Sequence, residues 1–159
     1  MKMIFAAVML LALAAPAHAE TKEEWIALGA RVHGAFGSFI PVGIRIGEDA
    51  KRRLDAPMRE LTVDYIWGEA APCPCIADGI ALAVGASAGQ NTLGIMPQKE
   101  KGVVMRAIIK HRKSGEGLEY VITEEWLPKI LDWNRQFDPA GRYDAAMKAE
   151  NLFQVKRLR

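Results

Sequence analysis

Three short segments of the chain carry residue types that can do chemistry. They are "RVHGAFGS" at 31–38, "APCPCIAD" at 71–78 and "VGASAGQNTLG" at 84–94. Imidazole and thiolate groups are ligands for zinc and copper, whereas imidazole, carboxylate and hydroxyl groups together make a hydrolytic triad. The candidate site residues in or near these segments are His33, Ser38, Arg45, Cys73, Cys75, Asp78, Ser87 and Gln90.

The two cysteines, Cys73 and Cys75, are separated only by Pro74. A cysteine pair in an oxidising compartment usually forms a disulfide, but a bridge across one residue closes a small, strained ring that is easily reduced. The spacing leaves three interpretations open: a structural disulfide, a redox device, or a pair of metal ligands or free thiols. It is not the C-x-x-C spacing of thioredoxin-like enzymes.

The three segments are each expected to join a strand or a turn to a helix. Backbone amides gather at helix N-termini and attract anions there. Glycines in the segment 84–94 permit close backbone approach, although the segment matches neither a P-loop nor a dinucleotide fingerprint. With Arg45 as an added positive charge, this pattern predicts a pocket for a small anionic or carboxylate-bearing ligand.

A hydrolytic site is the alternative use of the same residues. His33 and Asp78, with Ser38 or Ser87, are the residue types of a Ser-His-Asp triad. The chain has no G-x-S-x-G nucleophile elbow, so the sequence favours a binding role over hydrolysis.

The elements that must position these residues are predicted by local signals. Thr21 and Glu24 form a capping box, which predicts a helix to about His33. Ser38 is the predicted N-cap of a second helix, which ends before Pro57. The positions of this second helix that should face the core are Val42, Ile46, Ala50 and Leu54.

Strands and further helices follow in alternation. The predicted strands are 61–67, 102–112 and 118–122, and the remaining predicted helices are 76–84, 128–136 and 143–151. This order predicts an α+β fold: a single domain with a small antiparallel-containing sheet packed with helices and a helical C-terminal tail. The basic residues at the end of that tail, Lys156, Arg157 and Arg159, are expected to face solvent.

The first residues have the pattern of a secretory signal peptide. An apolar run from Met3 to Ala14 is followed by Ala17-His18-Ala19, an A-x-A cleavage site. We therefore expect a signal peptide at 1–19, a domain at 20–125 and a helical extension at 126–159, with export to a periplasm and no membrane anchor. A formal net charge of +2 at pH 7 is too small to indicate the basic surface of a nucleic-acid-binding protein.

Together, the three segments resemble the motifs of the formylmethanofuran dehydrogenase E-subunit family. The first motif of that family resembles H-G-H-x-C-P-G-x-x-x-G-x-R, the second C-x-x-D-A-I-Q and the third G-C-T-x-G-K-x-N-L. The matching residues here are His33, Gly34, Gly43, Arg45, Cys75, Asp78, Ile80, Gly85, Gly89 and Leu93. The resemblance covers about residues 25–123.

The resemblance implies a transition-metal site whose ligands this chain has partly lost. Three of the family's donor positions fall on Ala35, Gly37 and Ala86, which donate nothing to a metal. His33, Cys73 and Cys75 could instead form a rebuilt site for zinc or copper. The resemblance also suggests a homodimer and a redox enzyme or metalloenzyme as partner.

From these observations we expect an exported, non-catalytic accessory protein that binds a metal ion or a small anionic ligand. Its pocket should lie between His33, Ser38, Arg45, Asp78 and the loop that holds Ser87 and Gln90. The alternative is a periplasmic thiol-redox or hydrolytic enzyme that uses Cys75, His33 and Asp78.

Overall fold

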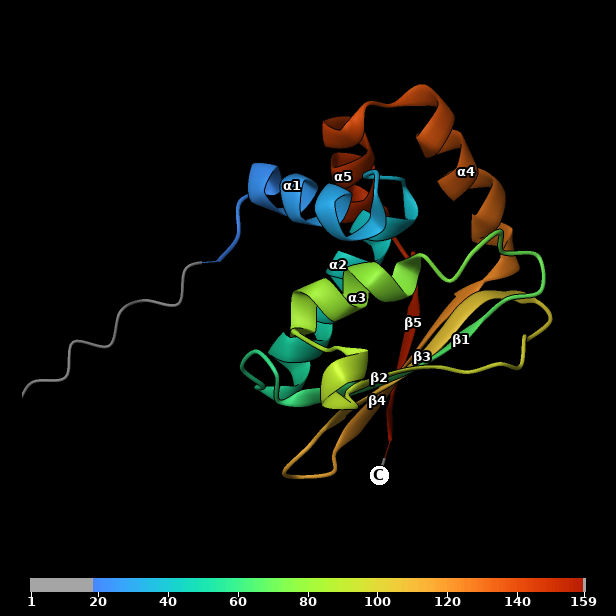
Figure 1. Cartoon of the computed structure of the whole chain (residues 1–159). Coiled ribbons are helices and arrows are strands. Elements are labelled where there is room, and N and C mark those ends of the chain that lie inside the picture. Colours follow the sequence, from blue (N-terminus) through green and yellow to red (C-terminus); the bar gives the residue numbers. More distant parts are fainter. Residues whose placement is uncertain (1–18, 159) are drawn as a thin grey trace, which may run out of the picture.

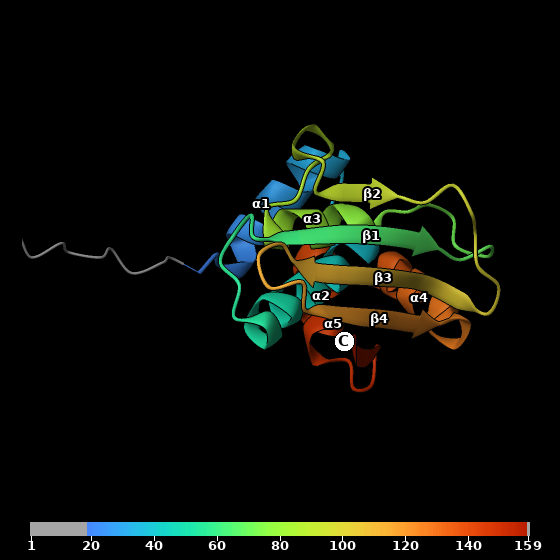
Figure 2. The same ribbon diagram turned by 90° about the horizontal axis from the view of Figure 1, so that it is seen from below.

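Alternating apolar residues build the strands of a five-stranded sheet on which the rest of the chain is assembled (Figure 1). The computed structural model describes residues 19–158, so Arg159 and all but the last residue of the predicted signal peptide lie outside the described residues. The helices cover one face of the sheet, and the opposite face is turned toward the viewer in Figure 2. The predicted α+β class is confirmed.

The sheet is mixed, with one parallel pair at its edge. In spatial order the strands are β2 (Leu93–Ile95), β1 (Leu61–Trp67), β3 (Val103–His111), β4 (Gly117–Thr123) and β5 (Gln154–Leu158). Strand β2 runs parallel to β1, and the other neighbours are antiparallel. The three predicted strands are β1, β3 and β4. The two strands not predicted are the short edge strands, β2 and β5.

The first helix, α1 (Lys22–His33), begins and ends where its local signals predict. The Thr21 hydroxyl accepts from the Glu24 amide at 3.3 Å, and the Glu24 carboxylate accepts from the Thr21 amide at 2.7 Å. The helix ends at Gly34, whose φ of +89° is a left-handed conformation that favours glycine. His33 is therefore held at the last position of a rigid element.

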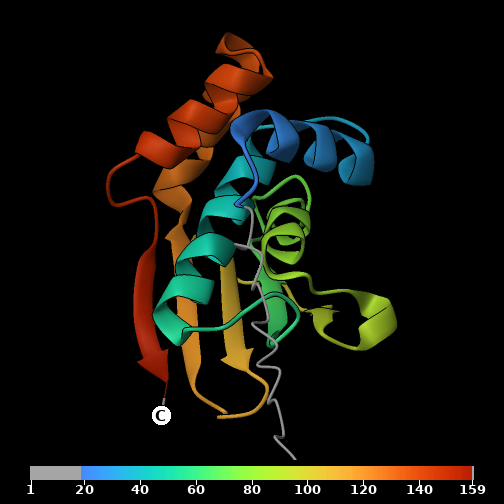
Figure 3. The same ribbon diagram turned by 90° about the vertical axis from the view of Figure 1, so that its left-hand side faces the viewer.

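The next two helices, α2 (Phe39–Leu54) and α3 (Ile76–Val84), lie side by side against the sheet (Figure 3). Ser38 occupies the N-cap position of α2, as predicted, but its side chain makes no capping hydrogen bond. Cys75 is the N-cap residue of α3, and its side chain likewise makes no capping hydrogen bond. The helices run parallel, since Gly43 faces Gly79 and Gly47 faces Ala83 one turn further along both helices. These small residues let the helices pack closely, and a Cβ added at Gly47 would lie 2.5 Å from the Ala83 Cβ. Their N-terminal ends therefore lie next to each other.

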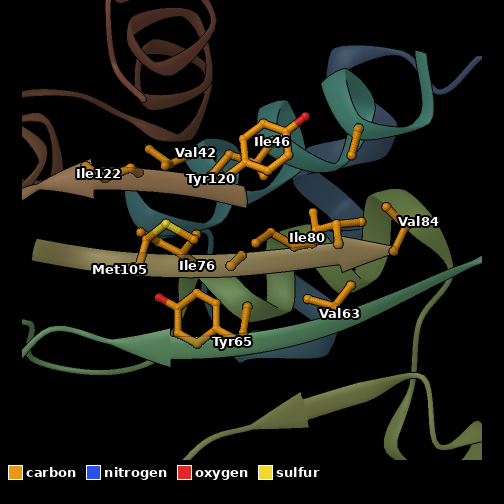
Figure 4. Close-up of a cluster of buried hydrophobic side chains, with 14 of the residues drawn as sticks. Val42, Ile46, Val63, Tyr65, Ile76, Ile80, Val84, Met105, Tyr120 and Ile122 are labelled. Carbon is orange, nitrogen blue, oxygen red and sulfur yellow. The ribbon is translucent and has the colours of Figure 1, made fainter. Parts of the chain in front are cut away.

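The core lies between these helices and the sheet (Figure 4). The predicted core positions of α2 are all buried: Val42, Ile46, Ala50 and Leu54. One charged residue, Asp49, is buried with them, and it accepts hydrogen bonds from the Tyr120 hydroxyl at 2.8 Å and from Arg53 Nε at 2.5 Å. These bonds satisfy a carboxylate that would otherwise be costly to bury.

The C-terminal segment differs from the predicted helical tail. Helix α4 (Leu127–Gln136) matches its prediction, but α5 (Pro139–Lys148) starts four residues earlier than predicted, because Asp138 caps it by accepting from the Gly141 amide at 2.8 Å. The chain then returns to the sheet as β5 instead of remaining a helical extension. Within residues 19–158, no helix is both long and apolar enough to cross a bilayer.

Candidate functional site

The end of α1 and the first turn of α3 bring His33 and Asp78 together. His33 Nδ1 lies 2.7 Å from Asp78 Oδ2, and the two side chains are 29% and 39% exposed. These two predicted site residues therefore form one pair at the surface. The bond fixes the orientation of the imidazole ring. The other ring nitrogen, Nε2, is not the one that bonds to Asp78.

A cavity of about 380 Å³ opens beside this pair. We call it the Ser38 cavity, since Ser38 at the start of α2 lies in its wall. Its polar lining comes from four side chains, and residues of α2, of α4, of the loop before α2 and of the loop before α3 complete the wall. The polar residues are His33, Ser38, Asn134 and Arg142, and the Cys73–Cys75 disulfide lies beside them.

Ser38 itself is fully buried, and its hydroxyl has no hydrogen-bond partner among the described residues. Its backbone amide is held by Asn134, whose side-chain oxygen accepts at 3.3 Å. A buried hydroxyl without a partner costs free energy, about 1 to 3 kcal/mol. An unpartnered polar group beside a cavity calls for an explanation, and a bound ligand or water is one that the chemistry of the hydroxyl allows.

Arg142 provides the positive charge of the Ser38 cavity. Its guanidinium donates to the Phe36 carbonyl at 3.0 Å and to the Asn134 carbonyl at 2.9 Å. Its Nε is buried without a partner, and no carboxylate in residues 19–158 forms an ion pair with it. Within this part of the chain, the hydrogen bonds of its guanidinium go to backbone carbonyls and not to a carboxylate.

Cys73 and Cys75 form a disulfide, with their Cα atoms 5.3 Å apart. Of the interpretations left open by the spacing, free thiols and thiolate ligands are excluded in this oxidised state. The bond lies at the N-terminal end of α3, and both cysteines are half-buried. It is therefore within reach of a molecule in the Ser38 cavity.

The oxidised protein does not fit the predicted zinc or copper site. A disulfide sulfur is not a thiolate, so Cys73 and Cys75 are lost as donors and only His33 remains of the three predicted ligands. In the described part of the chain, no three side chains of the His, Cys, Asp or Glu types are placed to hold a metal. The predicted donor set therefore requires the reduced protein.

Asp78, Ser87 and Gln90 line a different cavity from Ser38, so the single predicted pocket is in fact two. This second cavity, of about 480 Å³, lies between α3 and the loop after it. The Ser87 hydroxyl accepts from the Gln90 amide at 3.2 Å and caps a short 3-10 helix at Ala88–Gln90. These two residues therefore shape their own loop.

Arg45 does not lie in either of these cavities. Its guanidinium donates to the carbonyls of Ala146 and Ala149, both at 2.6 Å, and its central carbon lies 5.3 Å from the centre of the Phe153 ring. Burial lowers the pKa of Arg45, and the nearby Asp49 opposes that shift. Arg45 therefore anchors the end of α5 to α2 and lies apart from Ser38 and His33, and its role in ligand binding stays a prediction.

The predicted hydrolytic triad lacks its decisive bond. A Ser-His-Asp triad needs the serine hydroxyl to bond to the histidine that the carboxylate orients. The Ser38 hydroxyl has no partner among the described residues, and the Ser87 hydroxyl is used in its own loop. Of the triad, the structure brings together the His33–Asp78 half.

One known family matches most of the chain. The model of the FmdE family, described as "Molybdenum formylmethanofuran dehydrogenase operon", matches residues 32–157. The chain belongs to the FmdE family. No curated protein matches it closely enough to count as a relative.

The FmdE match extends beyond residue 123, where the resemblance seen in the sequence ended. It includes α4, α5 and most of β5, and with them Asn134 and Arg142. These two cavity residues were not predicted from the sequence. No local pattern marks them, because they reach the Ser38 cavity only when α4 and α5 fold back over α2.

Proposed function

We propose that this FmdE-family protein is an exported, non-catalytic accessory protein that binds a small anionic ligand in the Ser38 cavity. The observation that carries the proposal is the buried Ser38 hydroxyl, which has no partner among the described residues and lies in the cavity wall. The Nε of Arg142, which also has no partner among the described residues, is a second hydrogen-bond donor of a residue that lines the Ser38 cavity. A carboxylate or phosphate oxygen accepts from both groups.

The charges around the cavity favour an anion. Arg142 lines the cavity, whereas no acidic residue of the described chain is among the residues that line it. The N-terminal end of α2 lies in the wall, and Cys75 places the start of α3 beside it. Helix N-termini carry partial positive charge, and charge-assisted hydrogen bonds are about twice as strong as neutral ones.

Export rests on the sequence alone. The apolar run from Met3 to Ala14 and the A-x-A site before Glu20 support secretion through the general pathway to a periplasm. A disulfide between Cys73 and Cys75 is consistent with such an oxidising compartment.

Two further parts of the proposal concern partners: a redox enzyme or metalloenzyme that the protein serves, and a second copy of this chain in a homodimer. Zinc or copper binding is proposed only for the reduced protein, in which both thiolates are available with His33.

Titration calorimetry of the oxidised protein with succinate and with inorganic phosphate tests the binding site. We expect saturable binding of at least one of these anions. The variants Ser38→Ala and Arg142→Gln each remove one donor, so each should weaken binding about tenfold or more.

The control for these variants is Arg112→Gln, because Arg112 is exposed and also donates to a backbone carbonyl, that of Arg59 at 3.2 Å. It should bind the anions as the wild type does. If both cavity variants are folded and bind like the wild type, the site is not where we place it. If turnover of an ester depends on His33 and Asp78, the hydrolytic alternative replaces the binding role.

A further inference from the structure

The Cys73–Cys75 disulfide forms part of the wall of the Ser38 cavity. Cys75 is held firmly, because it is the N-cap of α3 and packs against both hydrophobic clusters of the core. Cys73 belongs to the loop that precedes α3. A ligand whose anionic end is bound by Ser38 and Arg142 therefore has a disulfide within the same cavity.

This disulfide contributes little to holding the fold together. A disulfide stabilises a protein by restricting the unfolded chain, and the restriction grows with the length of the loop that it closes. Only Pro74 lies between the two cysteines. The turn is also held without the sulfurs, since the Ala77 amide donates to the Pro74 carbonyl at 2.9 Å. The bond can therefore open while the fold persists.

We propose that the Cys73–Cys75 disulfide oxidises small dithiols that carry an anionic group, one dithiol for each protein molecule and so without catalytic turnover, with the anion held by Ser38 and Arg142. The proposal rests on the proposed function, because the anion site of the Ser38 cavity selects the substrate. A volume of about 380 Å³ suits a small molecule better than a folded partner.

The exchange takes place in two steps. A thiolate of the substrate attacks the Cys73 sulfur, the Cys73–Cys75 bond breaks, and Cys75 leaves as a thiolate at the N-terminal end of α3. The positive end of that helix stabilises the leaving thiolate. The second thiol of the substrate then attacks the first substrate sulfur, which is bonded to Cys73 in the mixed disulfide, and Cys73 leaves as a thiolate. The substrate leaves as a cyclic disulfide, having lost two electrons and two protons, and the protein gains two thiols.

A comparison of two dithiols that differ in charge tests this proposal. Oxidised protein is mixed with dihydrolipoate, which carries a carboxylate, or with its neutral amide, dihydrolipoamide, at equal concentration. Samples are quenched by alkylation, and the remaining disulfide is measured by mass spectrometry. We expect dihydrolipoate to reduce the protein about tenfold faster than dihydrolipoamide, the factor that one charge-assisted hydrogen bond provides.

Variants assign this preference to the cavity. In Arg142→Gln the ratio of the two rates should fall to about one, and Ser38→Ala should lower it as well. Arg112→Gln should leave the ratio unchanged. Circular dichroism checks the fold of each variant, and Ser38→Ala, which only removes an oxygen, remains informative if Arg142→Gln does not fold.

The outcomes separate this proposal from the proposed function. Equal rates for the two dithiols in the wild type, or no reduction by either, overturn the exchange proposal. Calorimetry with succinate and phosphate is measured independently on the oxidised protein. Binding of these anions without charge-selective reduction leaves the accessory function standing and removes only the redox activity.

Discussion

Gly43 on α2 lies directly against Gly79 on α3. A Cβ atom added at Gly43 would lie 2.8 Å from the Gly79 Cα, and one added at Gly79 would lie 2.9 Å from the Gly43 Cα. The two backbones can approach this closely only because neither residue has a side chain. The contact aligns the parallel helices so that Ser38 and Cys75, at their N-termini, both reach the Ser38 cavity.

Gly43→Ala should destabilise the protein by about 2 to 3 kcal/mol, because the added methyl forces α2 and α3 apart and neither backbone can yield locally. The matched control is Gly89→Ala, since no atom lies within 4 Å of a Cβ added there and its φ is not in the left-handed region. Urea unfolding curves measure both changes. Equal stability of the two variants would show that the helices tolerate a wider separation.

Arg45→Gln should cost about 2 to 3 kcal/mol, because two charge-assisted hydrogen bonds to the Ala146 and Ala149 carbonyls are lost. Anion binding in the Ser38 cavity should not change, since Arg45 does not line it. Thermal unfolding and calorimetry on one preparation check both statements. A stable variant with weakened anion binding would show that Arg45 contributes to the ligand site.

The tyrosines should make the protein sensitive to alkaline pH. Burial raises the pKa of all three, Tyr65, Tyr120 and Tyr143, and the hydrogen bond to Asp49 adds to the shift of Tyr120. A pKa raised on folding contributes stability that is complete below the unfolded value of about 10 and is lost as the pH rises above it.

Tyrosinate absorbance and near-ultraviolet circular dichroism, followed together, test this pH dependence. Ionisation of Tyr65 and Tyr120 should coincide with the loss of tertiary structure, and half-buried Tyr143 should ionise first. The alkaline transition of Tyr120→Phe should be smaller, because one ionising group is gone. Reversible titration of all three tyrosines near pH 10 in folded protein would contradict the burial of Tyr65 and Tyr120.

Metal binding should depend on the redox state of the protein. Protein purified without reductant should contain no stoichiometric zinc or copper, because the disulfide consumes both thiolates that a site with His33 would need. Elemental analysis before and after reduction measures the content. Stoichiometric zinc in the unreduced protein, lost in Cys75→Ser, would mean that the thiols are free and bind the metal.

The exported protein should begin at Glu20, since cleavage by signal peptidase follows Ala19 in the A-x-A site. N-terminal sequencing of protein recovered from the periplasm checks this expectation. A variant with Ala19→Pro should accumulate uncleaved. Recovery of the intact chain from Met1 in wild-type cells would refute export by this route.

The sequence by itself determined the elements whose signals are local. The capping box of Thr21 and Glu24, the left-handed Gly34 and the alternation in 61–67 each depend on neighbours within a few residues, so the boundaries of α1 and β1 were predictable. That His33 and Asp78 lie close together was expected from the resemblance of their segments to motifs of one family. Strand β2, with only three residues, was too short to leave a pattern.

Only the tertiary structure decided which residues form the site. Arg45 belongs to a segment that resembles a family motif and Arg142 has no such signal, yet Arg45 is bonded to the end of α5 while Arg142 reaches the Ser38 cavity from α5. Which arginine faces the cavity depends on how α5 crosses α2, a contact between residues about a hundred positions apart. Local propensity contains no information about such a contact, because its free energy comes from surfaces that meet only after folding.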